Sequence, residues 1–139
     1  MRPTLVALCL AASLPARADT AAGSTEMCSV DVGSSTREVG LGQRGRLVVV
    51  LRPRRPWHID PRAPLRIRLD RPAGLSIDRV DLGRKDAVDP AALEPRFETG
   101  FAATSAGTRE VAARLDFFVC SETACARQAR TVKIPVTVR

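Results

Sequence analysis

The sequence predicts an all-β domain, an immunoglobulin-like β-sandwich of about seven to nine short strands. Two observations support this fold class. Apolar and polar residues alternate with a period of two in several segments, and short turns rich in proline or glycine separate these segments. No long amphipathic helix or internal repeat accompanies them. The chain beyond residue 18 has 139 − 18 = 121 residues, enough for one domain with a hydrophobic core and too few for two.

Residues 1–18 have the features of a secretory signal peptide. Arg2 supplies a thin basic start, Thr4–Leu14 is apolar, and Ala16-Arg17-Ala18 fits the small-x-small pattern that precedes a cleavage site. The apolar run is shorter than the roughly 20 residues that a membrane-spanning helix needs. We therefore expect the mature chain to begin near Asp19.

Cys9 lies inside this apolar run and is expected to leave with the signal peptide. A lipoprotein anchor is the competing interpretation, but Leu8 stands where a small residue normally precedes an acylated cysteine. Export without an anchor is favoured. We expect the mature protein to be periplasmic or secreted, with no stable membrane insertion after signal cleavage. Disulfides are permitted in both of these compartments.

Three strands are expected before the Pro72–Gly74 turn. Residues 19–44 form a polar N-terminal segment in which Met27–Val32 is a possible first strand, and residues 45–139 form the sandwich domain. Arg46–Arg52 is apolar on both faces, which is typical of a central strand. Pro53 and Pro56 follow it, and proline cannot donate to a strand ladder. Leu65–Asp70 alternates cleanly and predicts the next strand.

The strand after the Pro72–Gly74 turn changes its pattern partway. Leu75 and Ile77 share one parity, whereas Val80 and Leu82 share the other, so we expect a bulge near Asp78-Arg79. Residues 84–94 should form a loop, with one helical turn opened by Asp89 and Pro90.

The last third of the chain carries the most informative pattern. Strands are expected over Phe97–Ala103, Arg109–Val119 and Thr131–Arg139. In the middle one, apolar residues occupy every odd position from 111 to 119. Phe118 and Cys120 fall on the opposite, polar face, so this strand predicts a thiol exposed to solvent.

Cys120 and Cys125 are separated by four intervening residues, and only Cys28 remains besides them once the leader is removed. A bridge between the close pair closes a six-residue ring and stabilises by roughly 2 kcal/mol, whereas a bridge from Cys28 to either closes about 90 residues and gives roughly 4.5 kcal/mol. Stability alone would favour the long bridge. The short pair therefore fits reactivity somewhat better, with a structural hairpin staple as the open alternative.

The surroundings of the pair leave further alternatives open. Arg127 and Arg130 would lower a thiol pKa, and Glu122 would oppose them, unless the arginines only solvate a turn. Phe118 either shields the disulfide, contacts a partner, or is an ordinary surface aromatic. Cys28 is buried, pairs between chains, or competes for the short bridge.

The charge of the chain does not point to nucleic acid. The leader contains two of the 22 basic residues and no acidic one, which leaves 20 − 15 = +5. The basic residues are scattered, and aromatic residues make up 4% of the chain. A nucleic-acid surface would need clustered charge interleaved with aromatics, so no nucleic-acid partner is expected.

Trp57 and His58 are the only tryptophan and histidine, and prolines flank them. One histidine and scattered cysteines do not supply the matched ligand set of a zinc or copper site, so neither a metal nor another cofactor is expected. A corner anchored by Trp57 that closes the sandwich is the favoured interpretation. Shielding of the disulfide or contact with a partner is a second role for Trp57 and His58.

Two motifs together resemble the N-terminal periplasmic domain of DsbD, the thiol:disulfide interchange protein, and its stand-alone secreted relatives. They are Trp57-His58-Ile59 after a central strand and Phe117-Phe-Val-Cys-Ser-Glu-Thr-Ala-Cys125 before a final Val/Ile strand. The resemblance covers roughly residues 45–139. One departure is that Ala126-Arg-Gln-Ala129 follows the pair, where the family commonly has prolines.

The resemblance implies an immunoglobulin-like fold in which Cys120 and Cys125 are the exchanging pair. The implied partners are thioredoxin-like periplasmic proteins or a membrane-embedded thiol reductant. The alternative hypothesis is a non-catalytic secreted β-sandwich, a binding module whose short disulfide only pins its last hairpin.

Overall fold

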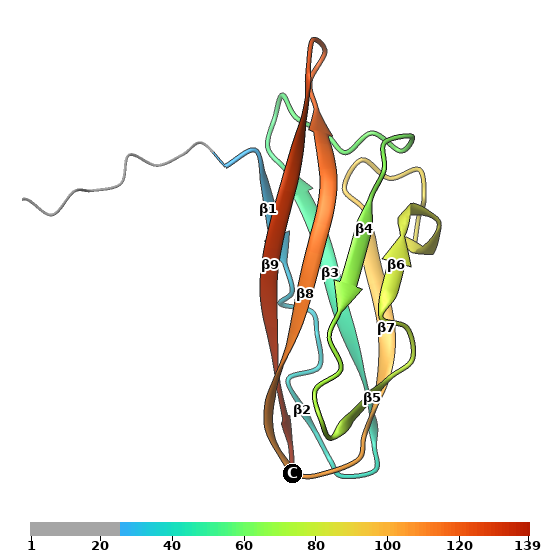
Figure 1. The fold of residues 1–139 in the computed structure, drawn as a ribbon, viewed down its shortest axis with the longest axis vertical. Helices are drawn as coiled ribbons and strands as arrows, with labels where there is room; N and C mark the ends of the chain where they lie inside the picture. The colour runs from blue at the N-terminus through green and yellow to red at the C-terminus, as the bar shows by residue number, and fades with distance from the viewer. Residues whose placement is uncertain (1–25) are drawn as a thin grey trace, which may run out of the picture.

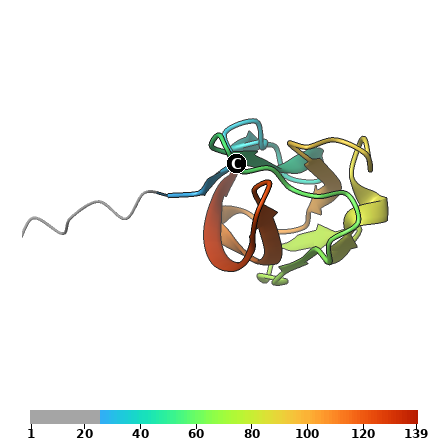
Figure 2. The same cartoon turned by 90° about the horizontal axis from the view of Figure 1, so that it is seen from above.

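The computed structural model describes residues 26–139, so the predicted signal peptide lies outside the described residues. Two β-sheets pack face to face, as the views from the side and from above show (Figures 1 and 2). The predicted all-β, immunoglobulin-like sandwich is confirmed. One sheet has the order β1-β3-β7-β5, comprising Cys28–Asp31, Arg44–Pro53, Arg96–Ala103 and Leu75–Ile77. The other has the order β2-β9-β8-β4-β6, comprising Glu38–Val39, Cys125–Val138, Gly107–Cys120, Arg66–Leu69 and Asp81–Gly83.

Strand β3 is central in its sheet, as its sequence predicts. It pairs with β1 on one side and β7 on the other, both antiparallel. Five consecutive residues from Leu47 to Leu51 are buried. Burial of both faces explains why this strand shows a continuous apolar run instead of alternation. The hydroxyl of Ser35 bonds to both backbone groups of Val48, which ties the loop after β1 to this strand.

Strands β8 and β9 form a long antiparallel hairpin of 14 residues each. The alternation predicted for β8 is confirmed, because the odd residues from Val111 to Val119 are buried in the core. The tip of the hairpin projects beyond the other loops at that end of the molecule, and the C-terminus lies at the opposite end (Figure 1).

Strand β9 begins at Cys125, six residues earlier than the sequence predicts. Its first half lacks an apolar face, since half-buried positions there include Gln128 and Arg130. Pairing with β8 continues through this half without interruption, from Cys120↔Cys125 onward. The partner strand, and not the local pattern, therefore extends β9.

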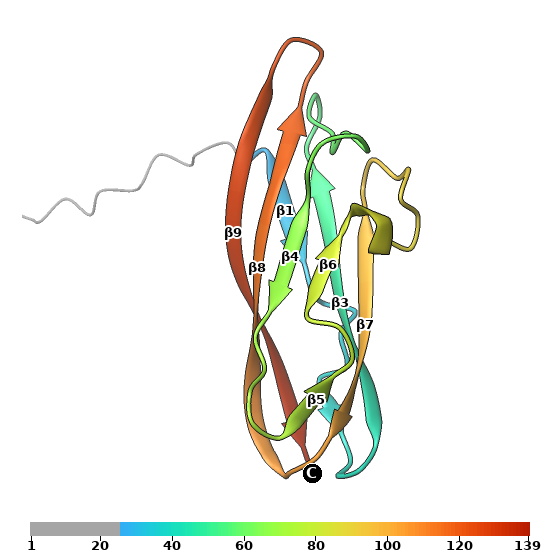
Figure 3. The same cartoon turned by 45° about the vertical axis from the view of Figure 1, so that its right-hand side comes forward.

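The predicted bulge near Asp78-Arg79 is wrong. The parity changes there because the chain passes from one sheet to the other: β5 pairs with β7, whereas β6 pairs with β4 (Figure 3). Leu75 and Ile77 are buried from one sheet, and Leu82 is buried from the other. A crossover and a bulge leave the same signature in the sequence.

The predicted helical turn at Asp89 and Pro90 is also misplaced. The one helical turn in the described part of the chain is the 3-10 turn η1 (Arg84–Asp86). The carboxylate of Asp86 accepts the N–H of Gly83 at 2.8 Å and so closes this turn. Asp89 instead accepts the N–H of Ala91 at 2.9 Å in a separate tight turn.

The polar segment predicted over residues 19–44 contributes two strands to the sandwich. The possible first strand is confirmed as β1, which pairs with β3. Strand β2 pairs in parallel with the end of β9. Cys28 and Val39 from these strands are buried in the core.

Candidate functional site

The cysteine pair closes the β8–β9 ladder at its tip. Cys120 and Cys125 form a disulfide with an S–S distance of 2.10 Å and a Cα–Cα distance of 4.0 Å. They are the last opposed pair of the two strands, and the four-residue loop between them is held by the Ser121 N–H, which donates to the Ala124 carbonyl at 2.7 Å. Opposed residues that do not bond to each other through the backbone approach to about 4.5 Å, so this position favours a bridge.

The two sulfur-bearing residues differ in exposure. Cys120 is buried, with 4% of its surface exposed, whereas Cys125 is exposed. The prediction that Cys120 presents its thiol to solvent is therefore wrong. Its position on the outer face of the sheet was predicted correctly, but another part of the chain covers it. Cys125 is the accessible member of the pair.

The Trp57-His58 corner holds Cys120 from the side opposite to Cys125. The His58 N–H donates to the Cys120 carbonyl at 2.9 Å, and the Cys120 N–H donates to the His58 carbonyl, also at 2.9 Å. Both backbone groups of Cys120 are thus satisfied away from β9. Trp57 packs half-buried against the core and Ile59 is buried, in agreement with a corner that closes the sandwich.

The sequence does not predict that His58 and Cys120 are neighbours. They are 62 residues apart, and the contact is an isolated bridge between their backbones, which any residue type can make. The only signal available was the family resemblance, which contains both segments but says nothing of their contact.

Two shallow depressions flank the disulfide. One, of about 550 Å³, lies between the loop before Trp57 and the hairpin tip, and is lined by Arg55, Pro56, Ser121, Glu122 and Thr123. The other, of about 220 Å³, includes Phe118, Pro64 and Arg127 in its wall. Phe118 is half-buried and lies on the same face as Cys120, directly opposite Arg127. The three possible contact residues Phe118, Trp57 and His58 therefore all lie close to the bridge in the fold.

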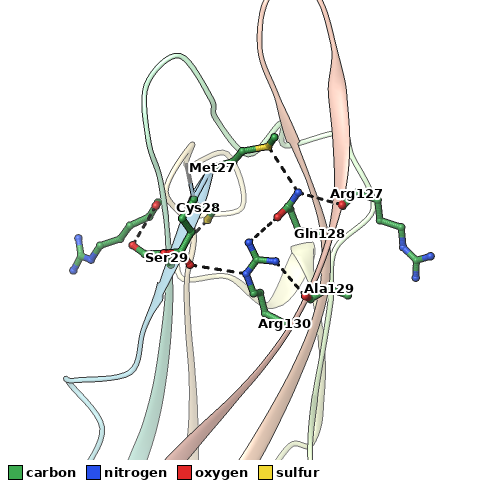
Figure 4. A network of polar contacts seen from close by, with 9 residues as sticks. Met27, Cys28, Ser29, Arg127, Gln128, Ala129 and Arg130 are labelled. Carbon is green, nitrogen blue, oxygen red and sulfur yellow. Dashed lines mark hydrogen bonds and ion pairs between the residues drawn. The ribbon is translucent and has the colours of Figure 1, made fainter. Parts of the chain in front are cut away.

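The two arginines expected near the pair point to opposite faces of β9. Arg127 lies on the outer face and forms an ion pair with Asp116 at 2.7 Å. Arg130 turns to the inner face, where its guanidinium donates to the Gln128 side chain at 2.8 Å and lies 4.0 Å from Glu26 (Figure 4). Arg127 alone is placed to influence Cys125.

Cys28 is a core residue with a free thiol. It has 0% of its surface exposed and lies at the start of β1, next to Met27 and near Arg130 of β9 (Figure 4). Burial raises the pKa of the Cys28 thiol to about 11, and the nearby Arg130 opposes the shift. Of the three alternatives for Cys28, burial is the one observed.

Residues 26–139 hold neither a cluster of metal ligands nor a membrane-spanning helix. In that range, no group of three or more His, Cys, Asp or Glu side chains is arranged to hold a metal ion. The same range contains no helix with the length and apolar character needed to cross a membrane.

Comparisons with known proteins give remote similarity only. No protein-family model and no curated protein matches the chain. Among solved structures, it is similar to domains 4 and 5 of the S-layer protein SbsC, with 14% identity and a TM-score of 0.43, over 79% of this chain and 50% of that one. The chain thus spans about half the length of that structure.

Two further solved structures are similar to the chain. One is a conjugative transposon lipoprotein from Bacteroides eggerthii, with 11% identity, a TM-score of 0.47, and coverage of 79% of this chain and 96% of that one. The other is the CooA pilin subunit from enterotoxigenic Escherichia coli, with 9% identity, a TM-score of 0.33, and coverage of 82% and 99%.

Proposed function

We propose that this chain is a thiol–disulfide exchange domain in which Cys120 and Cys125 alternate between disulfide and dithiol. The observation that carries the proposal is the unequal exposure of the pair at a projecting hairpin tip: Cys125 is exposed and Cys120 is buried. Exchange requires that an attacking thiolate reach one sulfur while the other leaves. Steric access therefore selects Cys125 as the sulfur that meets a partner.

The exchange transfers two electrons. When a reduced partner donates, its thiolate attacks the sulfur of Cys125, a partner–Cys125 disulfide forms, and Cys120 leaves as a thiolate. A second partner thiolate then attacks the partner sulfur of the mixed disulfide, and Cys125 leaves. In the reverse direction the Cys125 thiolate attacks a partner disulfide, and Cys120 resolves the mixed disulfide by attacking Cys125.

The partner class follows from the resemblance to the N-terminal domain of DsbD. We propose thioredoxin-like periplasmic proteins, or a membrane-embedded thiol reductant, as the exchanging partners. The predicted signal peptide places the reaction in the periplasm or outside the cell, where a disulfide persists. The departure from the family after Cys125 affects the contact surface, because Ala126-Arg-Gln-Ala129 stands where the family commonly has prolines.

A secreted binding module with a structural hairpin staple is the second candidate. The observation that favours it is the pair of backbone hydrogen bonds between Cys120 and His58, which holds one side of the disulfide in place. A staple at this position would keep the end of a 14-residue hairpin from fraying.

A redox titration of the Cys28→Ala protein separates the two functions. An exchanging pair is expected to have a reduction potential near that of thioredoxin-like proteins, about −270 mV, whereas structural disulfides lie below about −300 mV. Rapid opening by a stoichiometric amount of a reduced thioredoxin-like protein would agree with exchange. A potential below about −300 mV would favour the staple.

A further inference from the structure

Strand β9 has an open edge that begins at the disulfide. On one side it pairs with β8 along its whole length, but on the other side β2 pairs only with Thr137 and Val138. Within residues 26–139, no strand pairs with this side of β9 between Cys125 and Pro135. An edge of this length is a template for an added strand.

The hydrogen-bonding groups of the odd-numbered residues point to the open side. The N–H groups of Thr137 and Arg139 donate to β2-side carbonyls, at 2.7 Å to Arg37 and 3.0 Å to Val39. Backbone groups of alternate residues in a strand point the same way, so the N–H groups of Ala129 and Thr131 also face the open side. Pro135 falls in the same series, at a position where the missing N–H costs no bond to β8.

Cys125 belongs to this outward-facing series. An antiparallel strand added to the edge would place one residue opposite Cys125 in a hydrogen-bonded pair, with a Cα–Cα distance of about 5.5 Å. That spacing is the usual Cα–Cα distance of a disulfide, about 5.5–6 Å. Cys120 lies across β9 from the added strand. A partner sulfur would thus approach Cys125 on the side opposite to the leaving sulfur, which is the direction a displacement at sulfur requires.

The charges along the edge specify the incoming strand. Strand β9 carries three basic residues, Arg127, Arg130 and Lys133, and no acidic one. Arg127 and Lys133 lie on the outer face and pair with carboxylates of β8, Asp116 and Glu110, whereas Arg130 faces inward and lies 4.0 Å from Glu26. Because β8 lies one strand spacing of about 4.8 Å further from the edge than β9, an added strand meets the basic groups first. The same charges oppose pairing with the β9 edge of a second copy, since like charges would face each other.

We propose that the redox partner docks as an acidic extended segment, which adds antiparallel to the β9 edge between Cys125 and Lys133 and places its cysteine opposite Cys125. The docking rests on the proposed function for its chemistry. The partner thiolate bonds to the sulfur of Cys125, the Cys120–Cys125 bond breaks, and Cys120 takes the electron pair as a thiolate. The strand ladder supplies affinity, and the basic groups supply selectivity.

The first test compares thiols in their reaction with the oxidised protein. The probes are a nine-residue peptide of alternating threonine and glutamate with a C-terminal cysteine, the same peptide with lysine for glutamate, and 2-mercaptoethanol. We expect the acidic peptide to form the mixed disulfide about 10-fold faster than the basic one at low salt, with the difference shrinking at high salt. Equal rates for the two peptides would overturn the proposal.

Matched variants test the strand pairing itself. Ala129→Pro removes an outward N–H without touching the ladder to β8, and Ala129→Thr keeps that N–H. The proline variant should lose the advantage of the acidic peptide, the threonine variant should retain it, and all should react alike with 2-mercaptoethanol. Thr131→Pro repeats the test at a second position should Ala129→Pro fail to fold. Full retention of the advantage in a folded proline variant would contradict docking on this edge.

A measurement without redox chemistry keeps docking separate from the proposed function. With a peptide that carries serine in place of cysteine, hydrogen exchange at the Ala129 and Thr131 amides should slow by about 10-fold or more. The docking proposal would be overturned if the peptide left the exchange rates of these two amides unchanged, or if the amides were already protected in the free protein. If these amides become protected while 2-mercaptoethanol fails to open the disulfide, the docking site stands and the exchange function fails.

Discussion

The two cysteine regions of this molecule differ in what the fold does to a sulfur. Cys28 enters the core from a sheet edge strand, is fully buried, and has a thiol whose pKa is raised to about 11 by that burial. Cys120 and Cys125 lie at the end of a projecting hairpin (Figure 1), where Cys120 is buried and Cys125 is exposed. The same residue type is thus made inert in one place and accessible in the other. The difference shows that the exposure of a cysteine here depends on how segments far apart in the sequence pack around it.

The largest expected effect is in the alkylation of the reduced protein. Cys125 should react first with iodoacetamide, Cys120 more slowly, and Cys28 at least about 100-fold more slowly than Cys125 at pH 8, because two pKa units reduce its thiolate population about 100-fold before burial is counted. Mass spectrometry of digested samples over time checks the order. A Cys28 that reacts as fast as Cys125 would remove the basis of the comparison.

The pH dependence of stability sharpens the Cys28 side of the comparison. Its folded pKa of about 11 lies above the ordinary value of 9.0, so the folded state holds this proton more tightly than the unfolded state. The stabilisation is fully present below pH 9 and is lost as the pH rises to 11, by about 2–3 kcal/mol in the free energy of unfolding.

Urea denaturation at pH 8, 9, 10 and 11 measures this loss. The Cys28→Ala variant is the control: it should be less stable at pH 8 because the side chain leaves a small cavity, and its stability should fall less between pH 9 and 11. Parallel curves for the two proteins would show that the Cys28 thiol is not the group that titrates.

Removal of the disulfide tests how much the pair contributes to stability. The Cys120→Ala/Cys125→Ala protein should lose roughly 2 kcal/mol, the value expected for a six-residue ring, and should remain folded. Urea denaturation and circular dichroism at pH 7 measure it. A loss well above 3 kcal/mol would mean that the bridge is chiefly a staple, which favours the binding-module function.

The smallest expected effect concerns His58. Because its backbone, and not its side chain, bonds to Cys120, His58→Gln should change the exchange rate with 2-mercaptoethanol by less than about 2-fold. His58→Pro removes the N–H that bonds to Cys120 and should cost about 1 kcal/mol of stability and speed the exchange. A large effect of His58→Gln on the pH profile of exchange would instead assign the imidazole a direct role in proton transfer.

The sandwich class, most strands and the cysteine pair were all predictable from local patterns. In β8, alternation alone placed the odd residues from Val111 to Val119 inside and Phe118 with Cys120 on the outer face, because side chains of a strand alternate strictly between faces. In β3, a continuous apolar run was enough to predict a strand buried on both faces. These features depend on residues near each other in the chain.

Other features required the tertiary structure. The burial of Cys120, the extension of β9 to Cys125 and the crossover between Ile77 and Asp81 all depend on segments far away in the sequence. The parity of a strand fixes the face on which a side chain lies, but only long-range pairing decides whether that face is covered. For this protein, the sequence determined the sheet face on which Cys120 lies and the short spacing between Cys120 and Cys125. Only the tertiary structure decided that Cys120 is buried while Cys125 is exposed, because burial depends on segments far away in the chain.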